Sequence, residues 1–153
     1  MDIKAPVLRS LKSASQVFLK DLQAMPEDAF TKSFGSATRT VADIVYEVNL
    51  VNEHICMTLR GEEAFQWPDN GWIKAPQDFQ TKDVVVGAFE KSTQDIITTV
   101  DALSTEDLEA TVKTERGETP RFERCQFMAI HIWYHSGQLN YIQTLLGDSG
   151  WHW

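Results

Sequence analysis

Residues 40–61 read TVADIVYEVNLVNEHICMTLRG, and this stretch decides the fold. Thr38 or Thr40 can cap the start of a helix, because a threonine hydroxyl accepts hydrogen bonds from free backbone N–H groups, and Gly61 can end it. Between these ends, apolar residues recur at steps of three and four: Val41, Ile44, Val45, Val48, Val51, Ile55 and Leu59. This spacing predicts an amphipathic helix whose apolar stripe faces a core.

Three further segments of the chain have a helical pattern. The first has apolar residues at helical spacing from Val7 to Leu22 and ends before Pro26, which cannot continue a helix. A third helix opens at Thr81 and closes at Ser104. The fourth begins at Pro120, a residue suited to a first helical position, and runs about to Leu146.

The connections between these helices differ in length. Residues 62–80 contain the turn signals Trp67-Pro68, Asn70-Gly71 and Ala75-Pro76, so a long crossover joins the second helix to the third. Residues 104–107 could cap one short additional turn, and residues 110–119 predict a loop or a small hairpin. The sequence therefore predicts an all-α protein, a four-helix bundle with one long crossover, as a single domain over residues 1–153.

Charge and cysteine content narrow the function classes. Fourteen Lys and Arg residues against 22 Asp and Glu residues give a net charge of −8, which repels phosphate backbones and anionic membrane surfaces. The two cysteines, Cys56 and Cys125, are fewer than a secreted scaffold normally carries, and we expect both to be buried as small hydrophobes. The N-terminal residues lack a signal-peptide pattern. We therefore expect a cytoplasmic protein that binds neither nucleic acid nor membrane.

The fourth segment has no Asp, Glu, Lys or Arg from Cys125 to Gly147. That length could span a bilayer, but polar residues such as His131, His135 and Asn140 argue against it. The composition instead predicts a helix that is buried on most of its circumference.

Two histidines of this segment are the strongest candidates for chemistry. His131 and His135 are one turn apart and about 40° apart around the helix axis, on the face that carries Met128, Ile132 and Leu139. Histidines at this spacing can place two nitrogens on one transition metal at about 2.0–2.1 Å. The alternative is a pair of core histidines that hydrogen-bond to their neighbours.

A metal needs at least one more ligand, and the second helix offers Glu47 and His54. Both lie on the flank of the apolar stripe, but they are about 10 Å apart along the axis and are therefore rivals for one ion. His54 would complete a site of three imidazoles, whereas Glu47 would give two histidines and a carboxylate with open positions.

Several motifs together resemble the DinB/YfiT-like superfamily, which is unrelated to the DNA polymerase of similar name. They are the run from Thr40 to Val48, the run from His131 to Gln143 and the Leu146-Gly147-Asp148 ending. The resemblance implies a four-helix bundle with a crossover, often paired as a homodimer. It also implies a divalent metal held by one histidine of the second helix and an HxxxH pair of the fourth. Characterised relatives include bacillithiol S-transferases and mycothiol-dependent isomerases.

Carried onto this chain, the resemblance assigns His131 and His135 to the metal-binding pair. Glu47 stands where the second helix usually presents its histidine, so it is the favoured third ligand, with His54 as its rival. The expected cofactor is a divalent transition metal, zinc or nickel, and the expected substrate is a small molecule, with a low-molecular-weight thiol as cosubstrate. Candidates for the pocket or for contacts to the ligands are Tyr46, Asn49, Asn52, Tyr134 and Gln138.

The resemblance leaves two classes of function open. The first is a metal-dependent transferase or hydrolase, in which a bound ion lowers the pKa of a water or thiol. The second is a non-catalytic, metal-free dimeric helical binding module. In either case Trp151 and Trp153, at the apolar C-terminus, together with the pairing habit of the superfamily, predict a homodimer.

Overall fold

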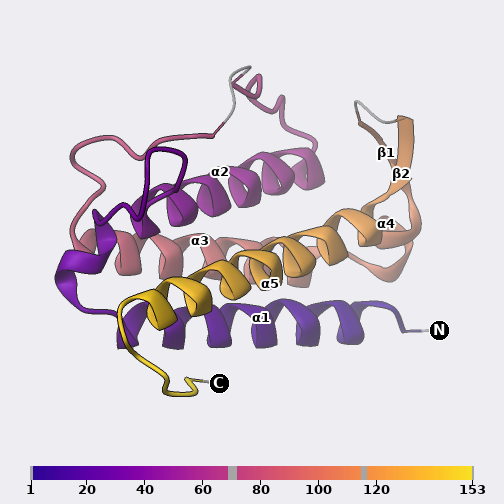
Figure 1. Ribbon diagram of the computed structural model, residues 1–153. Helices are drawn as coiled ribbons and strands as arrows, with labels where there is room; N and C mark the ends of the chain where they lie inside the picture. Colours follow the sequence, from indigo (N-terminus) through magenta and orange to yellow (C-terminus); the bar gives the residue numbers. More distant parts are fainter. Residues whose placement is uncertain (1, 69–71, 115–116, 153) are drawn as a thin grey trace.

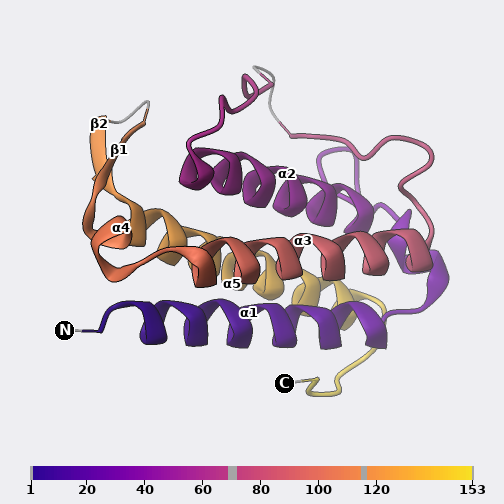
Figure 2. The same ribbon diagram turned by 180° about the vertical axis from the view of Figure 1, so that it is seen from behind.

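Four long helices lie side by side in the computed structural model, which describes residues 2–68, 72–114 and 117–152 (Figure 1). They are α1 (Lys4–Ala24), α2 (Val41–Arg60), α3 (Lys82–Ala102) and α5 (Arg121–Leu145). Both α1 and α2 pack against α3 and α5, as the view from behind also shows (Figure 2). The predicted helical bundle is therefore confirmed.

The ends of α2 are set by the residues that the sequence indicated. Thr40 accepts a hydrogen bond from the backbone of Asp43, and the Asp43 carboxylate accepts one from the backbone of Thr40. This reciprocal pair satisfies two N–H groups that the first turn leaves free. At the other end Gly61 adopts a φ of 75°, a left-handed conformation that glycine reaches without a steric penalty.

The crossover between α2 and α3 returns along the bundle, so that α3 runs in the same direction as α2 and α5 runs in the opposite direction (Figure 1). Its described part is anchored where Asp43 accepts a hydrogen bond of 2.8 Å from the backbone of Ala75. The turn expected at Asn70-Gly71 lies outside the described residues. The first turn of α2 therefore holds the crossover in place as well as starting the helix.

Three shorter elements complete the chain. A 3-10 helix, η1 (Glu27–Phe30), follows α1 and was not foreseen from the sequence. The short turn predicted at 104–107 forms α4 (Thr105–Glu109), capped by Ser104. Residues 110–119 form the hairpin alternative, in which β1 (Thr111–Thr114) pairs antiparallel with β2 (Gly117–Pro120). Because Pro120 lies at the end of β2, α5 starts one residue later than predicted.

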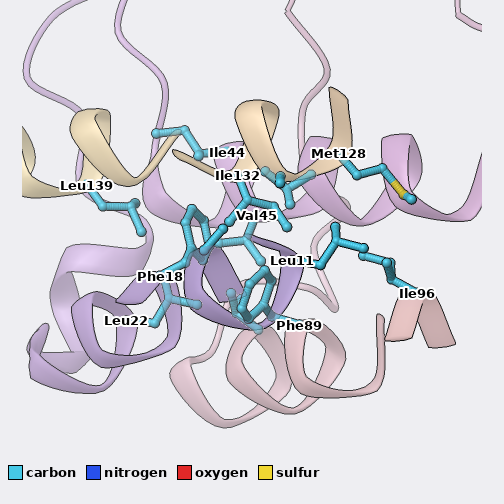
Figure 3. Close-up of a cluster of buried hydrophobic side chains, with 14 of the residues drawn as sticks. Leu11, Phe18, Leu22, Ile44, Val45, Phe89, Ile96, Met128, Ile132 and Leu139 are labelled. Carbon is cyan, nitrogen blue, oxygen red and sulfur yellow. The ribbon is translucent and has the colours of Figure 1, made fainter. Parts of the chain in front are cut away.

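The core lies along the axis of the bundle, where all four long helices contribute side chains (Figure 3). Phe18 of α1 and Phe89 of α3 pack with ring centroids 4.5 Å apart. Cys56 and Cys125 are free thiols buried in this core, and burial raises the pKa of Cys56 to about 11 and of Cys125 to about 12. Both cysteines therefore act as small apolar side chains, as predicted.

As predicted, α5 is buried or half-buried on most of its circumference. One face of this helix is exposed and largely apolar, and it carries Phe127, Ile130, Tyr134, Tyr141 and Leu145. The remaining faces are covered by α1, α2, α4 and the hairpin. Among the described residues, no helix is both long and apolar enough to cross a membrane. At the C-terminus Trp151 is 80% exposed, and Trp153 lies outside the described residues.

Candidate metal centre

Three potential metal ligands converge where α2 crosses α5. Glu47 comes from the second turn of α2, and His131 and His135 come from consecutive turns of α5. One ligand atom from each lies within 4.8 Å of the other two. The Nε2 atoms of the two histidines are 3.1 Å apart, and the Glu47 Oε1 atom lies 3.8 Å from His131 Nε2 and 3.7 Å from His135 Nε2.

Helix geometry explains this convergence. The four-residue spacing places the two imidazoles on one side of α5, edge to face, with ring centroids 4.4 Å apart. Glu47 is on the flank of the α2 stripe, between the buried residues that face α5 and the half-buried ones toward solvent. His135 is fully buried and the His131 side chain is 12% exposed, so the site lies at the edge of the core.

The donor set suits a divalent transition metal. Bonds of 2.0–2.1 Å in a tetrahedral arrangement would place two nitrogens about 3.3 Å apart, close to the observed separation of the two Nε2 atoms. Glu47 Oε1 is slightly farther from each nitrogen, within the range that a small side-chain rotation closes. Two imidazoles and one carboxylate would leave coordination positions open for water or substrate.

Gln138 sets the orientation of His135. Its Oε1 atom lies 2.8 Å from His135 Nδ1 and can accept the proton of that nitrogen, which leaves the Nε2 lone pair facing the other two ligands. This arrangement is typical of histidines that bind metals. His131 Nδ1 is buried and has no hydrogen-bond partner among the described side chains and backbone.

Electrostatics keep Glu47 ionised. Contacts with His131 and His135, and then the Arg39 guanidinium, hold the pKa of Glu47 far below its usual range, although burial opposes this. Burial lowers the pKa of His131, which favours its neutral form. A charged carboxylate and a neutral imidazole are the forms in which these residues bind a metal.

The other predicted pocket residues occupy different surroundings. Tyr134 lies against the His135 ring at 4.9 Å, and Tyr46 packs edge-on against Phe79 of the crossover. Asn49 is half-buried, and its Oδ1 atom has no partner among the described residues. Asn52 points its amide toward α3, where it donates to Ser92 Oγ. Tyr134 and Gln138 both contact His135.

The rival ligand, His54, lies apart from the triad. Its ring packs edge-on against Phe65 and Trp67, at centroid distances of 5.2 and 6.1 Å. It lines a groove of about 810 Å³ between α2, α5 and the hairpin. The groove approaches the three converging side chains at Phe127, which lines it and also stacks on His131 at 5.7 Å.

Sequence reasoning missed Arg39. Its Nη2 atom lies 2.5 Å from Glu47 Oε2 and donates to the backbone oxygen of Asp43. A basic residue just before a helix cap is normally solvent-exposed, so its type and position gave no signal.

Comparison with known structures supports the fold. A conserved protein from Enterococcus faecalis superposes with a TM-score of 0.75 at 14% identity, over 97% of this chain and 99% of that one. A DinB-like protein from Bacillus subtilis superposes with a TM-score of 0.65 at 12% identity, over 95% of this chain and 94% of that one. The mycothiol-dependent maleylpyruvate isomerase gives 0.72 at 16% identity over 89% of this chain, which spans only 60% of that enzyme.

Comparison with curated protein sequences finds no match. The family comparison, in contrast, covers almost the whole chain: the model of the DinB family matches residues 1–150. The motifs in α2 and α5 that resembled this family lie within the matched range, and the structural relatives share its bundle. The chain therefore belongs to the DinB family.

Proposed function

We propose that the protein is a metal-dependent enzyme that acts on a small molecule, with Glu47, His131 and His135 as ligands of a divalent transition metal. The single observation that carries this proposal is the convergence of three metal-binding side chains within 4.8 Å at one point between α2 and α5. Zinc and nickel both suit two imidazoles and a carboxylate. The alternative is a pair of core histidines beside a carboxylate that is held by its ion pair with Arg39.

The reaction we propose is transfer to or from a low-molecular-weight thiol, with hydrolysis as the variant in which water replaces the thiol. A bound divalent ion would lower the pKa of that thiol or water. His135 is held for this role by Gln138, and Tyr134 covers one side of the His135 ring. The mixed apolar and polar groove beside His131 offers space for the second substrate.

The thiol is supported by a distant relative. The maleylpyruvate isomerase of similar fold is described as mycothiol-dependent, which makes a thiol cosubstrate a reasonable class to test here. At 16% identity the likeness shows the shared fold alone. The activity of that enzyme therefore serves here only to choose an assay.

The experiment combines metal content with catalysis. Protein purified without a histidine tag is loaded with zinc, and the conjugation of monochlorobimane with a series of low-molecular-weight thiols is followed by fluorescence. We expect one zinc per chain and a zinc-dependent rate above the buffer rate, both lost in His135→Ala. His54→Gln should retain the zinc. His152→Gln is the matched control and should retain both, because this histidine pairs with Asp148 near the C-terminus. If the protein binds one zinc per chain but shows no zinc-dependent rate with any thiol, the proposed thiol cosubstrate is contradicted. If the protein binds no zinc, the proposal of a metal-dependent enzyme is contradicted.

A metal-free helical binding module is the second candidate. The observation that favours it is the exposed apolar face of α5. Such a face can bind a partner protein or a second copy of this chain. In that case the 3.1 Å contact between His131 and His135 would be a plain hydrogen bond. Protein that stays free of zinc at micromolar concentrations would support this candidate.

A further inference from the structure

The guanidinium group of Arg39 is buried beside the metal centre with most of its donors unused. The side chain is 7% exposed, and its Nη2 atom contacts Glu47 and the Asp43 carbonyl. Its Nε and Nη1 atoms, although buried, have no hydrogen-bond partner among the described residues. Three of the five N–H donors of the side chain belong to these two nitrogens. A charged group in this state is costly to maintain, because each unmet donor loses its hydration without a replacement.

From this geometry we infer that Arg39 binds the carboxylate of the substrate, or of the thiol cosubstrate, next to the metal. The inference rests on the proposed function and adds a substrate class to it, a small carboxylic acid. Arginine is suited to this task because its planar group matches the oxygens of a carboxylate. An anion held there would satisfy donors that no described residue satisfies.

The charge of the site points to the same class of ligand. Glu47 and Arg39 neutralise each other, so a divalent ion would leave two positive charges at the centre. Asp43, one turn before Glu47 on α2, has a carboxylate that already accepts hydrogen bonds from the backbones of Thr40 and Ala75. Even with the charge of Asp43 included, the loaded site remains positive and favours an anion.

The crossover controls access to Arg39. The indole of Trp72 lies over the guanidinium, 5.0 Å from ring centroid to Cζ, and Trp72 itself is 60% exposed. The crossover is fixed nearby by the contact between Ala75 and Asp43, whereas the exposed ring of Trp72 can rotate without unpacking the core. An entering carboxylate would therefore displace the Trp72 ring and keep the guanidinium shielded from water.

The test uses cobalt(II)-loaded protein and simple thiols as probes. Thiolate coordination to cobalt gives an absorption band, so dissociation constants are measured directly for 3-mercaptopropionate, 2-mercaptoethanol and cysteamine. We expect 3-mercaptopropionate to bind about tenfold or more tightly than 2-mercaptoethanol, as charge-assisted hydrogen bonds of this kind allow, and cysteamine to bind weakest. Inorganic phosphate should compete less well than propionate. Phosphate competing more strongly would overturn the carboxylate as the ligand class.

Substitution of Arg39 separates its role from general effects on the metal. In Arg39→Gln, the preference for 3-mercaptopropionate over 2-mercaptoethanol should disappear, and Arg39→Lys should keep part of it. Because the preference is a ratio within one loaded variant, a change in cobalt affinity does not affect it. Arg60→Gln is the matched control, since Arg60 lies at the opposite end of α2 and pairs with Glu62 and Asp95. An equal preference in wild type and Arg39→Gln would overturn the inference.

The outcomes also distinguish this inference from the proposed function. Cobalt binding without any preference among the thiols overturns the role of Arg39 and leaves the metal centre intact. If no cobalt binds, the proposed function fails, and the metal-free protein is titrated with propionate while the Nε signal of Arg39 is followed by NMR. A saturable shift, absent with propanol, would retain the anion site, and an unchanged signal would remove it.

Discussion

The Nε2 atom of His135 lies 3.7 Å from the Oε1 atom of Glu47, across the contact between α5 and α2. The second polar atom of each side chain contacts a different neighbour. His135 directs Nδ1 to Gln138, and Glu47 directs Oε2 to Arg39. Both groups are therefore already oriented toward a common point before any ligand binds, which reduces the reorganisation that metal binding would require.

Removal of either histidine should abolish stoichiometric zinc binding. His131→Ala and His135→Ala each delete one of three ligands, whereas Gln138→Ala removes only the acceptor that orients His135 and should weaken zinc binding about 10- to 100-fold. Competition with a chromophoric chelator measures these affinities. Far-ultraviolet circular dichroism should show that all three variants remain helical, and unchanged zinc content in both histidine variants would refute the site.

Zinc affinity should fall as the pH is lowered, because imidazole must be neutral to bind a metal. An ordinary histidine gains its proton near pH 6.5. Because burial lowers the pKa of His131, protons compete with the metal for this residue only at lower pH. Glu47, whose pKa is far below its usual range, stays ionised throughout. Affinity should be level at neutral pH and decline below about pH 6.5, and zinc retained at pH 4 would indicate other ligands.

Asp21 should make stability depend on pH. This fully buried carboxylate of α1 accepts hydrogen bonds from Ser136 and Asn140 of α5, yet burial raises its pKa above the ordinary value. A raised pKa in the folded state means that stability is lost as the pH rises through that pKa. Asp21→Asn removes the charge and keeps the shape. The free energy of unfolding of this variant relative to wild type should therefore increase from pH 4 to pH 7.

Chemical denaturation at several pH values measures this difference for Asp21→Asn. The constant penalty of placing an amide at that position cancels in the comparison. A difference that stays level or decreases toward pH 7 would show that the hydrogen bonds from α5 outweigh the burial of the charge.

The expected homodimer can be tested on the exposed face of α5. Side chains such as Tyr141, which is 66% exposed, could contribute to an interface of roughly 1,200–2,000 Å² in total. Tyr141→Glu should shift the mass measured by light scattering from two chains to one at micromolar concentration. Val84→Glu, an exposed apolar position on α3, serves as the control. A wild-type mass of one chain would refute the dimer.

Much of the fold could be predicted because the sequence encodes helix ends and apolar faces locally. Thr40, Asp43 and Gly61 act through contacts within a few residues, so α2 could be delimited from the chain alone. The histidine pair was equally accessible, since its geometry depends only on the helical repeat. These features need no knowledge of how the helices pack.

The remaining features depend on contacts between distant segments. Periodicity identified one apolar side of α5, but it did not show that Ile130 and Tyr141 would lie outside the packed region. Asn52 was a candidate for the pocket, yet the rotation of α2 turns it toward Ser92. Arg39 gains its significance only when the chain before α2 folds back along Glu47. The resemblance already favoured Glu47 over His54, but the position of Glu47 beside the two histidines depends on the packing of α2 against α5.

The most direct measurement of the central claim is a crystal structure of zinc-loaded protein with anomalous data collected on both sides of the zinc edge. The account predicts one zinc peak per chain, bonded to Nε2 of His131, Nε2 of His135 and Oε1 of Glu47 at about 2.0–2.2 Å. A peak at His54 that is remote from Glu47, or no peak in folded protein with excess zinc, would contradict it.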